Sequence, residues 1–237
     1  MFLGGVNFSL IFNATQGRIK ELRENTPLKV FVWFVLAGAV VFSIDIIAGG
    51  EDLTFLDVTL VPLFQSVSLL SSTGLVDPGF LNWGSVSAVL LIIMMIVGAC
   101  AGSTSGGAKI DRFVILFRFI KNEFYKMMHP GAVMTVSFNG RGTPNSIVNK
   151  TLAFLFMYFI VIVTGGVALA MLGLDLTSGF LCALMSISNT GLDMEATGVN
   201  YSLMCDAAKW ILAFIMLVGR LEIFTVLLLF TPSFWKK

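Results

Sequence analysis

The sequence predicts an all-α integral membrane protein made of two parallel span–pore-helix–span repeats, with the pore loops entering from outside. Three observations support this fold class. The chain has 237 residues, of which 57% are hydrophobic and 12% are charged, whereas soluble domains have about 25% charged residues. Its mean hydropathy is +0.91. Two half-length apolar segments each end in Thr-Gly-Leu, and basic residues gather on one side of the predicted spans.

The first half of the chain begins with a complete span. Val30–Ala48 holds 19 residues, enough to cross ~30 Å of hydrocarbon. Leu60–Leu70 is also apolar but holds only 11 residues, so we expect it to be re-entrant or buried. Val86–Val97 starts the next span, and Ile110–Met128 is expected to continue as a mixed apolar and basic helix.

A run of small residues, Gly98–Lys109, lies where this span should continue. Its glycines and hydroxyl residues are Gly98, Gly102, Ser103, Thr104, Ser105, Gly106 and Gly107. Each glycine weakens a helix by about 1 kcal/mol relative to alanine, so we expect the helix to break here. Non-helical backbone at membrane depth is tolerated where it is buried in protein or lines a water-filled cavity. The run therefore indicates a pathway; the alternative is a small-residue face for helix packing.

The second half repeats this order of segments. His129–Gly142 is expected to form a cytoplasmic hairpin that turns at Asn139-Gly140. Thr151–Leu172 is long enough for a span, Thr177–Ile187 is again half-length, and Ala207–Phe230 is expected to be a final span.

Equivalent loops follow the two half-length segments. Ser72-Thr73-Gly74-Leu75 and Asn189-Thr190-Gly191-Leu192 are related by an offset of 117 residues. Because each unit crosses the membrane twice, the two units have the same orientation, which makes the repeat parallel rather than inverted.

The basic residues predict the orientation in the membrane. Of 15 Lys and Arg residues, 13 fall on one side of the spans: Arg18, Lys20, Arg23, Lys29, Lys109, Arg112, Arg118, Lys121, Lys126, Arg141, Lys150, Lys236 and Lys237. That side is expected to be cytoplasmic. The opposite side carries mainly acidic residues, including Glu51, Asp52, Asp57, Asp77, Asp193 and Glu195. These carboxylates should concentrate cations near an external mouth.

A half-length helix that ends in Thr-Gly suits a cation site. Its C-terminus directs the negative end of the helix dipole towards the membrane centre, and glycine adopts positive φ without steric cost. Backbone carbonyls beyond the turn can then replace the water shell of an ion. The two tetrapeptides are therefore the predicted filter, with K⁺ expected at Thr73, Gly74, Thr190 and Gly191.

Several of these motifs resemble the Trk/Ktr/HKT superfamily of potassium transporters, and most closely its TrkH type. They read SLLSSTGL, VGACAGSTSGGAKIDR, SISNTGLD and LVGRLEIFTVLLLF, together with the His-Pro and Asn-Gly-Arg of the hairpin region. The resemblance covers essentially the whole chain. It implies four linked span–pore-helix–span units around one pore, of which this chain would supply the third and fourth. Two filter loops would then lie in the rest of a longer chain or in a paired chain.

The resemblance also implies boundaries, a gate and partners. Residues 1–29 would be the tail of a preceding unit and a linker, 30–128 and 151–237 the two units, and 129–150 the cytoplasmic hairpin and linker. The intramembrane gate would be residues 98–107, with Arg220 bonded to its carbonyls and adding an electrostatic barrier. The family further implies a homodimer in the plasma (inner) membrane and a cytosolic ring of nucleotide-binding regulatory subunits, for which Arg118, Lys121, Lys126 and His129 are candidate contacts.

The expected function is therefore potassium uptake, with the potassium ion as substrate and no bound cofactor. The sequence holds no residue set typical of an enzyme, and a net charge of +1 suggests no nucleic-acid partner. Two alternatives remain at this stage. One is a cation-coupled secondary transporter with its substrate at broken helices. The other is a non-conducting, half-length subunit.

Overall fold

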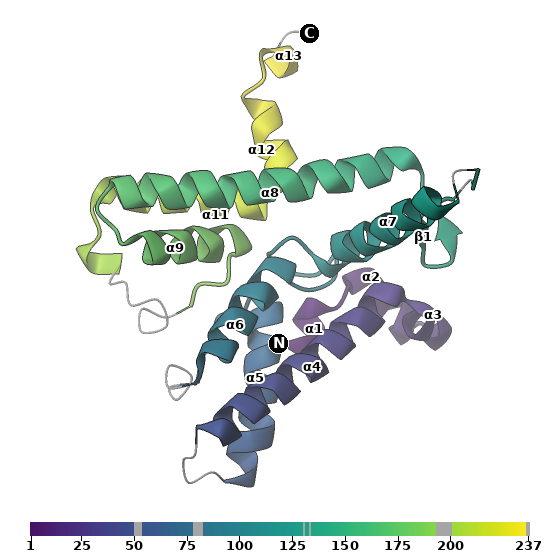
Figure 1. The fold of residues 1–237 in the computed structure, drawn as a ribbon, viewed down its shortest axis with the longest axis horizontal. Helices are drawn as coiled ribbons and strands as arrows, with labels where there is room; N and C mark the ends of the chain where they lie inside the picture. Colours follow the sequence, from purple (N-terminus) through teal and green to yellow (C-terminus); the bar gives the residue numbers. More distant parts are fainter. Residues whose placement is uncertain (50–53, 78–82, 130, 133, 193–200, 236–237) are drawn as a thin grey trace.

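The computed structural model describes residues 1–49, 54–77, 83–129, 131, 132, 134–192 and 201–235, and within them the chain is mostly helical. One helical cluster contains α4, α5 and α6, a second contains α8, α9 and α11, and α7 runs between them (Figure 1). Some residues predicted to face the two sides of the membrane lie outside the described residues: Glu51, Asp52, Asp193, Glu195, Lys236 and Lys237.

Three short helices precede the first predicted span. They are α1 (Phe2–Gly5), α2 (Phe8–Thr15) and α3 (Ile19–Glu24). The Asn7 side chain caps α2, because its Oδ1 accepts a hydrogen bond from the Ser9 amide at 2.8 Å. This segment lies beside the glycine-rich run of the first unit, as described below.

The two leading helices of the first cluster begin earlier than predicted. Helix α4 covers Thr26–Ala48 and starts after Asn25, whose side chain accepts from the Leu28 amide at 3.0 Å. Helix α5 covers Phe55–Leu70, because the Asp57 carboxylate accepts from the Thr54 amide at 3.0 Å and stabilises the first turn. Both predicted ranges begin at the apolar runs and therefore lack these capped polar turns.

The next helices match their predicted ranges closely. Helix α6 is Ser85–Val97 and α7 is Ile110–Met128. The two-residue strands β1 (Ser137–Phe138) and β2 (Arg141–Gly142) then pair antiparallel. Their turn has positive φ at Asn139 (49°) and Gly140 (76°), which is the type I′ conformation that Asn-Gly favours. The predicted hairpin is confirmed.

The second cluster is built on one long helix. Helix α8 (Asn145–Met171) packs along α9 (Leu176–Ser188), and α9 packs against α11 (Asp206–Arg220). The Asp175 carboxylate caps α9 by accepting from the Thr177 amide at 3.1 Å. Within the described residues, α11 is preceded by the 3₁₀ turn η2 (Tyr201–Leu203).

The final span predicted over Ala207–Phe230 is not one continuous helix. Helix α11 ends at Arg220, and α12 (Ile223–Leu229) begins three residues later at an angle of 112° to it. In Figure 1, α12 and the terminal α13 (Pro232–Trp235) lead away from α8 on the side opposite α9. The break was missed because the residues on both sides are apolar, so average hydropathy stays high across it.

Two described helices are long and apolar enough to cross a membrane, Thr26–Gly49 and Asn145–Met171, and a third results if the bent pair counts as one broken span. Helices α5, α6 and α9 are apolar but shorter. Both segments that lead into the Thr-Gly loops are therefore shorter than a complete span, although α5 has 16 residues rather than the 11 predicted.

The buried core joins the two clusters around these loops. Its largest fully buried side chains include Phe31, Phe42, Leu69 and Met94. Gly38 of α4 lies close to α6, and an added Cβ would lie 1.8 Å from Cε, the flexible end of the Met94 side chain. The Thr-Gly loops thus rest on a packed apolar base.

Candidate ion pathway

The two Thr-Gly loops have the same local geometry. We define them as Ser71–Leu75 and Ser188–Leu192. In the first loop the Ser71 and Thr73 hydroxyls lie 2.7 Å apart, and in the second the Ser188 and Thr190 hydroxyls lie 2.8 Å apart. The offset between these pairs is the 117 residues found in the sequence.

The backbone repeats this match. The Thr73 amide donates to the Ser68 carbonyl at 2.9 Å, and the Thr190 amide donates to the Met185 carbonyl at 3.2 Å. Each loop also has two residues with positive φ, Ser72 (53°) and Gly74 (76°) in the first, and Asn189 (51°) and Gly191 (62°) in the second. The positive φ expected of both glycines is present.

The two loops meet backbone to backbone. A Cβ added to Gly74 would lie 1.9 Å from the Thr190 carbonyl oxygen and 2.9 Å from that of Gly191. At Gly191 the same position meets no atom within 4 Å. One side of the second loop is therefore open, while the other side is in contact with the first loop.

The last residue of each tetrapeptide has different surroundings. The Leu75 carbonyl accepts a hydrogen bond from the Ser68 hydroxyl at 2.6 Å, and the Leu75 side chain is exposed. The Leu192 side chain is 2% exposed and belongs to the core. The equivalence of the loops is thus closest over their first residues.

The glycine segment, residues 98–109, contains no helix. Positive φ at Gly98 (65°), Gly102 (75°) and Gly107 (74°) folds it into a compact loop whose two ends touch. A Cβ at Gly98 would lie 2.5 Å from the Gly106 carbonyl oxygen. The predicted break is confirmed, and the alternative of a continuous small-residue packing helix is wrong.

The glycine segment contacts both Thr-Gly loops. The Gly106 amide donates to the Ser72 hydroxyl at 3.1 Å. A Cβ added to Gly106 would lie 1.9 Å from the Ser188 carbonyl oxygen. Glycine is required at this position because a larger residue would separate the segment from the second loop.

The N-terminal helices hold the outer face of the glycine segment. The Asn7 amide group donates to the Ala101 carbonyl at 2.7 Å, and the Thr104 amide donates to the Gly4 carbonyl at 3.1 Å. The Cys100 amide donates to the Gly5 carbonyl, also at 3.1 Å.

Arg220 binds the same segment from the second unit. Its Nη1 donates to the Thr104 carbonyl at 2.7 Å. The expected contact between Arg220 and a carbonyl of the segment is therefore present. Arg220 ends α11, directly after Gly219, where an added Cβ would lie 2.1 Å from the Ile187 carbonyl oxygen. This close packing brings α11 near the second Thr-Gly loop.

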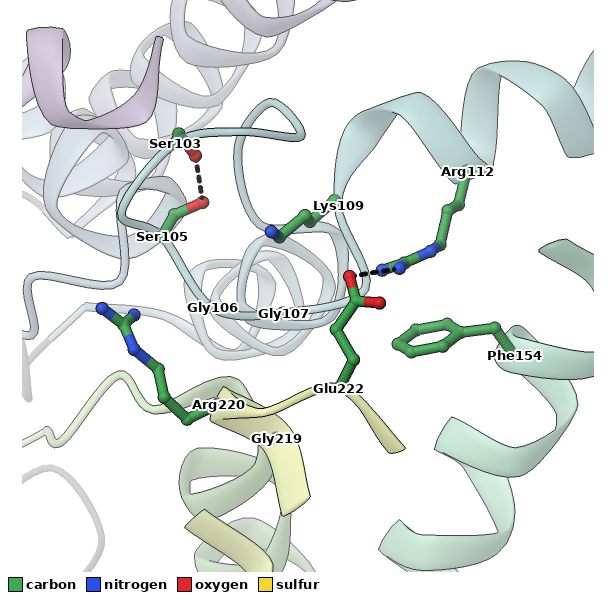
Figure 2. A pocket seen from close by; sticks show the side chains of 10 residues that line it. All are labelled: Ser103, Ser105, Gly106, Gly107, Lys109, Arg112, Phe154, Gly219, Arg220 and Glu222. Carbon is green, nitrogen blue, oxygen red and sulfur yellow. Dashed lines mark hydrogen bonds and ion pairs between the residues drawn. The ribbon is translucent and has the colours of Figure 1, made fainter. Parts of the chain in front are cut away.

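A polar cavity of about 110 Å³ lies between the glycine segment and the α11–α12 break. Figure 2 shows Lys109, Arg112 and Arg220 around it, with Glu222 reaching towards Arg112. The Arg112–Glu222 ion pair measures 2.8 Å. The ionisable side chains that line the cavity are three cations and one anion, so its field should oppose an entering cation.

The structure shows that Arg112 is largely enclosed, with 19% of its side chain exposed. Its guanidinium carbon lies 3.6 Å from the centroid of the Phe154 ring, and its Nη1 donates to the Ala108 carbonyl at 3.1 Å. Neither Arg112 nor Phe154 was predicted as part of the site.

A second internal alignment relates the end of the glycine segment to the break after Arg220. Residues 106–110 read GGAKI and residues 219–223 read GRLEI, at an offset of 113. Lys109 and Glu222 occupy matching positions and share one backbone conformation, with φ of 71° and 64° and ψ of 134° in both. Each precedes a helix that starts with a buried isoleucine.

Comparisons with known proteins agree with this architecture. A family model described as TrkH, cation transport protein, matches residues 54–237. The chain belongs to the TrkH family. It is 30% identical, over its whole length, to the Trk system potassium uptake protein TrkH of Salmonella typhimurium and to that of Escherichia coli K12. It is also similar to the crystal structure of the potassium transporter TrkH from Vibrio parahaemolyticus, with a TM-score of 0.92 and 30% identity over 99% of this chain.

The TrkH-family assignment confirms the resemblance read from the sequence. The chain spans about half the length of the curated relatives that it matches, 49% of the two relatives named above and 51% of the solved structure. This share fits the expectation that the chain supplies two of four units.

Proposed function

We propose that this chain forms half of a pathway that takes up potassium ions across the plasma (inner) membrane. The observation that carries the proposal is the contact between two equivalent Thr-Gly loops, each at the C-terminus of a half-length helix. The names of its relatives support potassium as the substrate, because they are potassium uptake proteins.

In the proposed filter, carbonyls of Thr73, Gly74, Thr190 and Gly191 replace water around the ion. The C-termini of α5 and α9 contribute the negative ends of their helix dipoles at the same place. The open side of Gly191 is where we expect the ion, together with the two loops that complete the ring. Those loops would come from the remaining two units, in the same longer chain or in a paired one.

In the proposed gate, the glycine segment closes the pathway beneath the filter. Its contacts with Ser72 and with the carbonyl of Ser188 place its backbone against both loops. Arg220 holds the segment through Thr104 and adds positive charge to the polar cavity. Opening would require this hydrogen bond to break and the segment to move.

The remaining topology belongs to the same proposal. The two units are parallel repeats, the pore loops enter from outside, and the basic side faces the cytoplasm. A homodimer and a cytosolic ring of nucleotide-binding subunits are the proposed partners. Lys121 is exposed and stays a candidate contact for the ring, whereas Lys126 pairs with Glu123 at 2.7 Å and Arg118 bonds to the hairpin.

Rubidium uptake tests this function. The protein, expressed at its natural full length in bacteria without their own potassium uptake systems, should take up rubidium, and Gly191→Asp should abolish uptake or its selectivity. Gly140→Asp is the matched control, because Gly140 also has positive φ (76°) and open space but lies in the hairpin. Equal uptake by Gly191→Asp and the unmodified protein at equal expression would refute the filter. A flux that required protons at fixed stoichiometry would favour the secondary-transporter alternative, and no uptake by the unmodified protein would favour the non-conducting one.

A further inference from the structure

Helices α4, α6 and α7 enclose an apolar groove of about 540 Å³ that the ion pathway does not use. Its walls are formed mainly by aliphatic and aromatic side chains, including Val30, Phe34, Ile93, Val97, Ile110 and Phe117. The volume lies within the range of small-molecule sites. The groove favours an apolar occupant, because water would gain few hydrogen bonds there.

Within the described part of the chain, the groove is open on one side. Phe117 is 68% exposed and Ile93 is 42% exposed. In a chain of this membrane family, the apolar molecules that reach such a surface are lipid acyl chains. Helix α7 has the mixed basic and apolar composition of helices that lie at the boundary between head groups and acyl chains.

One end of the groove is polar, and it lies at the hairpin. Thr26 and Arg118 are the polar residues of the lining. The Thr26 amide donates to the Asn139 side chain at 2.9 Å, and Arg118 Nη1 donates to the Ser137 carbonyl. Because one hairpin holds both residues, they lie at the same end of the groove. This is the end expected at the cytoplasmic head groups.

Arg118 retains donors for an anion. Among the described residues, its Nε and Nη2 have no hydrogen-bond partner, since only Nη1 is used. A guanidinium binds phosphate through paired N–H donors. Lys29 and Lys121 are exposed on the neighbouring turns of α4 and α7 and add positive charge.

We propose that this groove binds one acyl chain of an anionic phospholipid, whose phosphate is held by Arg118. The site goes beyond the proposed function, since lipid binding does not require ion conduction. Val97 and Ile110 line the groove and also flank the glycine segment on its two sides. A bound chain would therefore pack against both helix ends that anchor the segment. Only an effect of this lipid on ion flux would depend on the proposed function.

The test is native mass spectrometry of the purified, delipidated, full-length protein, titrated with phosphatidylglycerol or phosphatidylcholine. We expect one phosphatidylglycerol per chain to bind more tightly than phosphatidylcholine. Arg118→Gln should weaken phosphatidylglycerol binding by about fivefold, the effect of one basic residue near anionic lipid. Lys209→Gln is the charge control, because Lys209 lies on α11 and outside the groove lining.

A second pair of variants tests the apolar part. Ile93→Trp should fill the groove and reduce binding, whereas Ile92→Trp should not, because Ile92 is similarly exposed (37%) but lies outside the lining. Binding of phosphatidylcholine as tight as that of phosphatidylglycerol would overturn the proposal. So would wild-type lipid binding by both Arg118→Gln and Ile93→Trp. If Ile93→Trp instead lowers the dimer fraction with lipid binding intact, the groove holds a second copy of the chain and the lipid assignment is wrong.

Discussion

Gly74 and Gly191 occupy equivalent positions in the two Thr-Gly loops, but their surroundings differ. Both have positive φ, so any other residue is strained there by about 1–2 kcal/mol. Only Gly74 faces the other loop, with the Thr190 carbonyl oxygen 1.9 Å from where a Cβ would be. At the residue scale, one glycine is needed for its conformation and the other for both conformation and space.

Gly74→Ala should therefore be more damaging than Gly191→Ala. Gly191→Ala adds backbone strain alone, and we expect it to lower the thermal unfolding temperature by about 2–8 °C. Gly74→Ala must also separate the two loops, so it should lower the unfolding temperature further and abolish rubidium uptake. Thermal unfolding in detergent and uptake in cells measure both effects. Equal effects of the two variants would show that the loops do not touch.

Arg220→Ala tests the gate at the same scale. A hydrogen bond from a charged donor contributes about 1.5–3 kcal/mol, so removing the Arg220–Thr104 bond should raise basal rubidium flux by roughly tenfold or more. Lys209→Ala is the matched control, because Lys209 is a cation on the same helix that pairs with Asp206 away from the segment. Unchanged flux and unchanged regulation in Arg220→Ala would exclude this role.

At the element scale, the two units are interrupted at matching positions. Helix α7 follows Lys109 and helix α12 follows Glu222, and both residues have a backbone conformation that non-glycine residues rarely adopt. The first interruption belongs to the glycine segment. The second packs against the glycine segment and the second Thr-Gly loop. Strain of this kind persists where surrounding contacts enforce it, and here the enforcing contacts are those of the proposed gate.

Lys109→Gly should stabilise the fold, because glycine adopts this φ without steric cost. The relief of about 1–3 kcal/mol is partly offset by the greater freedom of glycine in the unfolded chain. We expect a net rise in the unfolding temperature of about 2–4 °C. Lys109→Ala removes the same charge but keeps the strain, so a similar rise in both variants would attribute the effect to charge instead.

At the scale of the whole molecule, the glycine segment is where three parts of the chain meet. The N-terminal helices bond to it through Gly4, Gly5 and Asn7, the first Thr-Gly loop through Ser72, and the second unit through Arg220. A change in any of these parts can therefore reach the segment, as expected for the proposed gate.

Asn7→Ala should loosen the segment without changing the filter. It removes the bond to the Ala101 carbonyl and the cap of α2. Cys100 is 1% exposed beside these contacts, so it should react faster with a membrane-permeant thiol reagent in Asn7→Ala, measured with Cys205 replaced by serine. Asn13→Ala, which removes a side-chain bond to Glu21 instead, is the control. An unchanged rate at Cys100 would show that Asn7 does not restrain the segment.

The membrane class, the short helices before the Thr-Gly loops, the hairpin, the break at the glycine segment and the family could all be predicted from the amino-acid sequence alone. These follow from composition, segment length, turn residues and motifs, all of which act locally along the chain. The helix starts at Thr26 and Phe55 depended on caps at polar residues that lie outside the apolar runs. Their side-chain bonds could have been suspected from Asn25 and Thr54, but hydropathy alone does not detect them.

The remaining features depend on tertiary packing. Two of them are contacts between residues from different elements: Gly74 with Thr190, and the Arg112–Glu222 ion pair with the Phe154 ring. The third is the 112° break between α11 and α12. Mean hydropathy along the chain does not detect a break between two apolar helices. The sign of a side-chain charge does not identify the residue with which it forms an ion pair. These features depend on which surfaces of the two units pack together. Packing between residues far apart in the sequence decides this, and local sequence patterns do not show it.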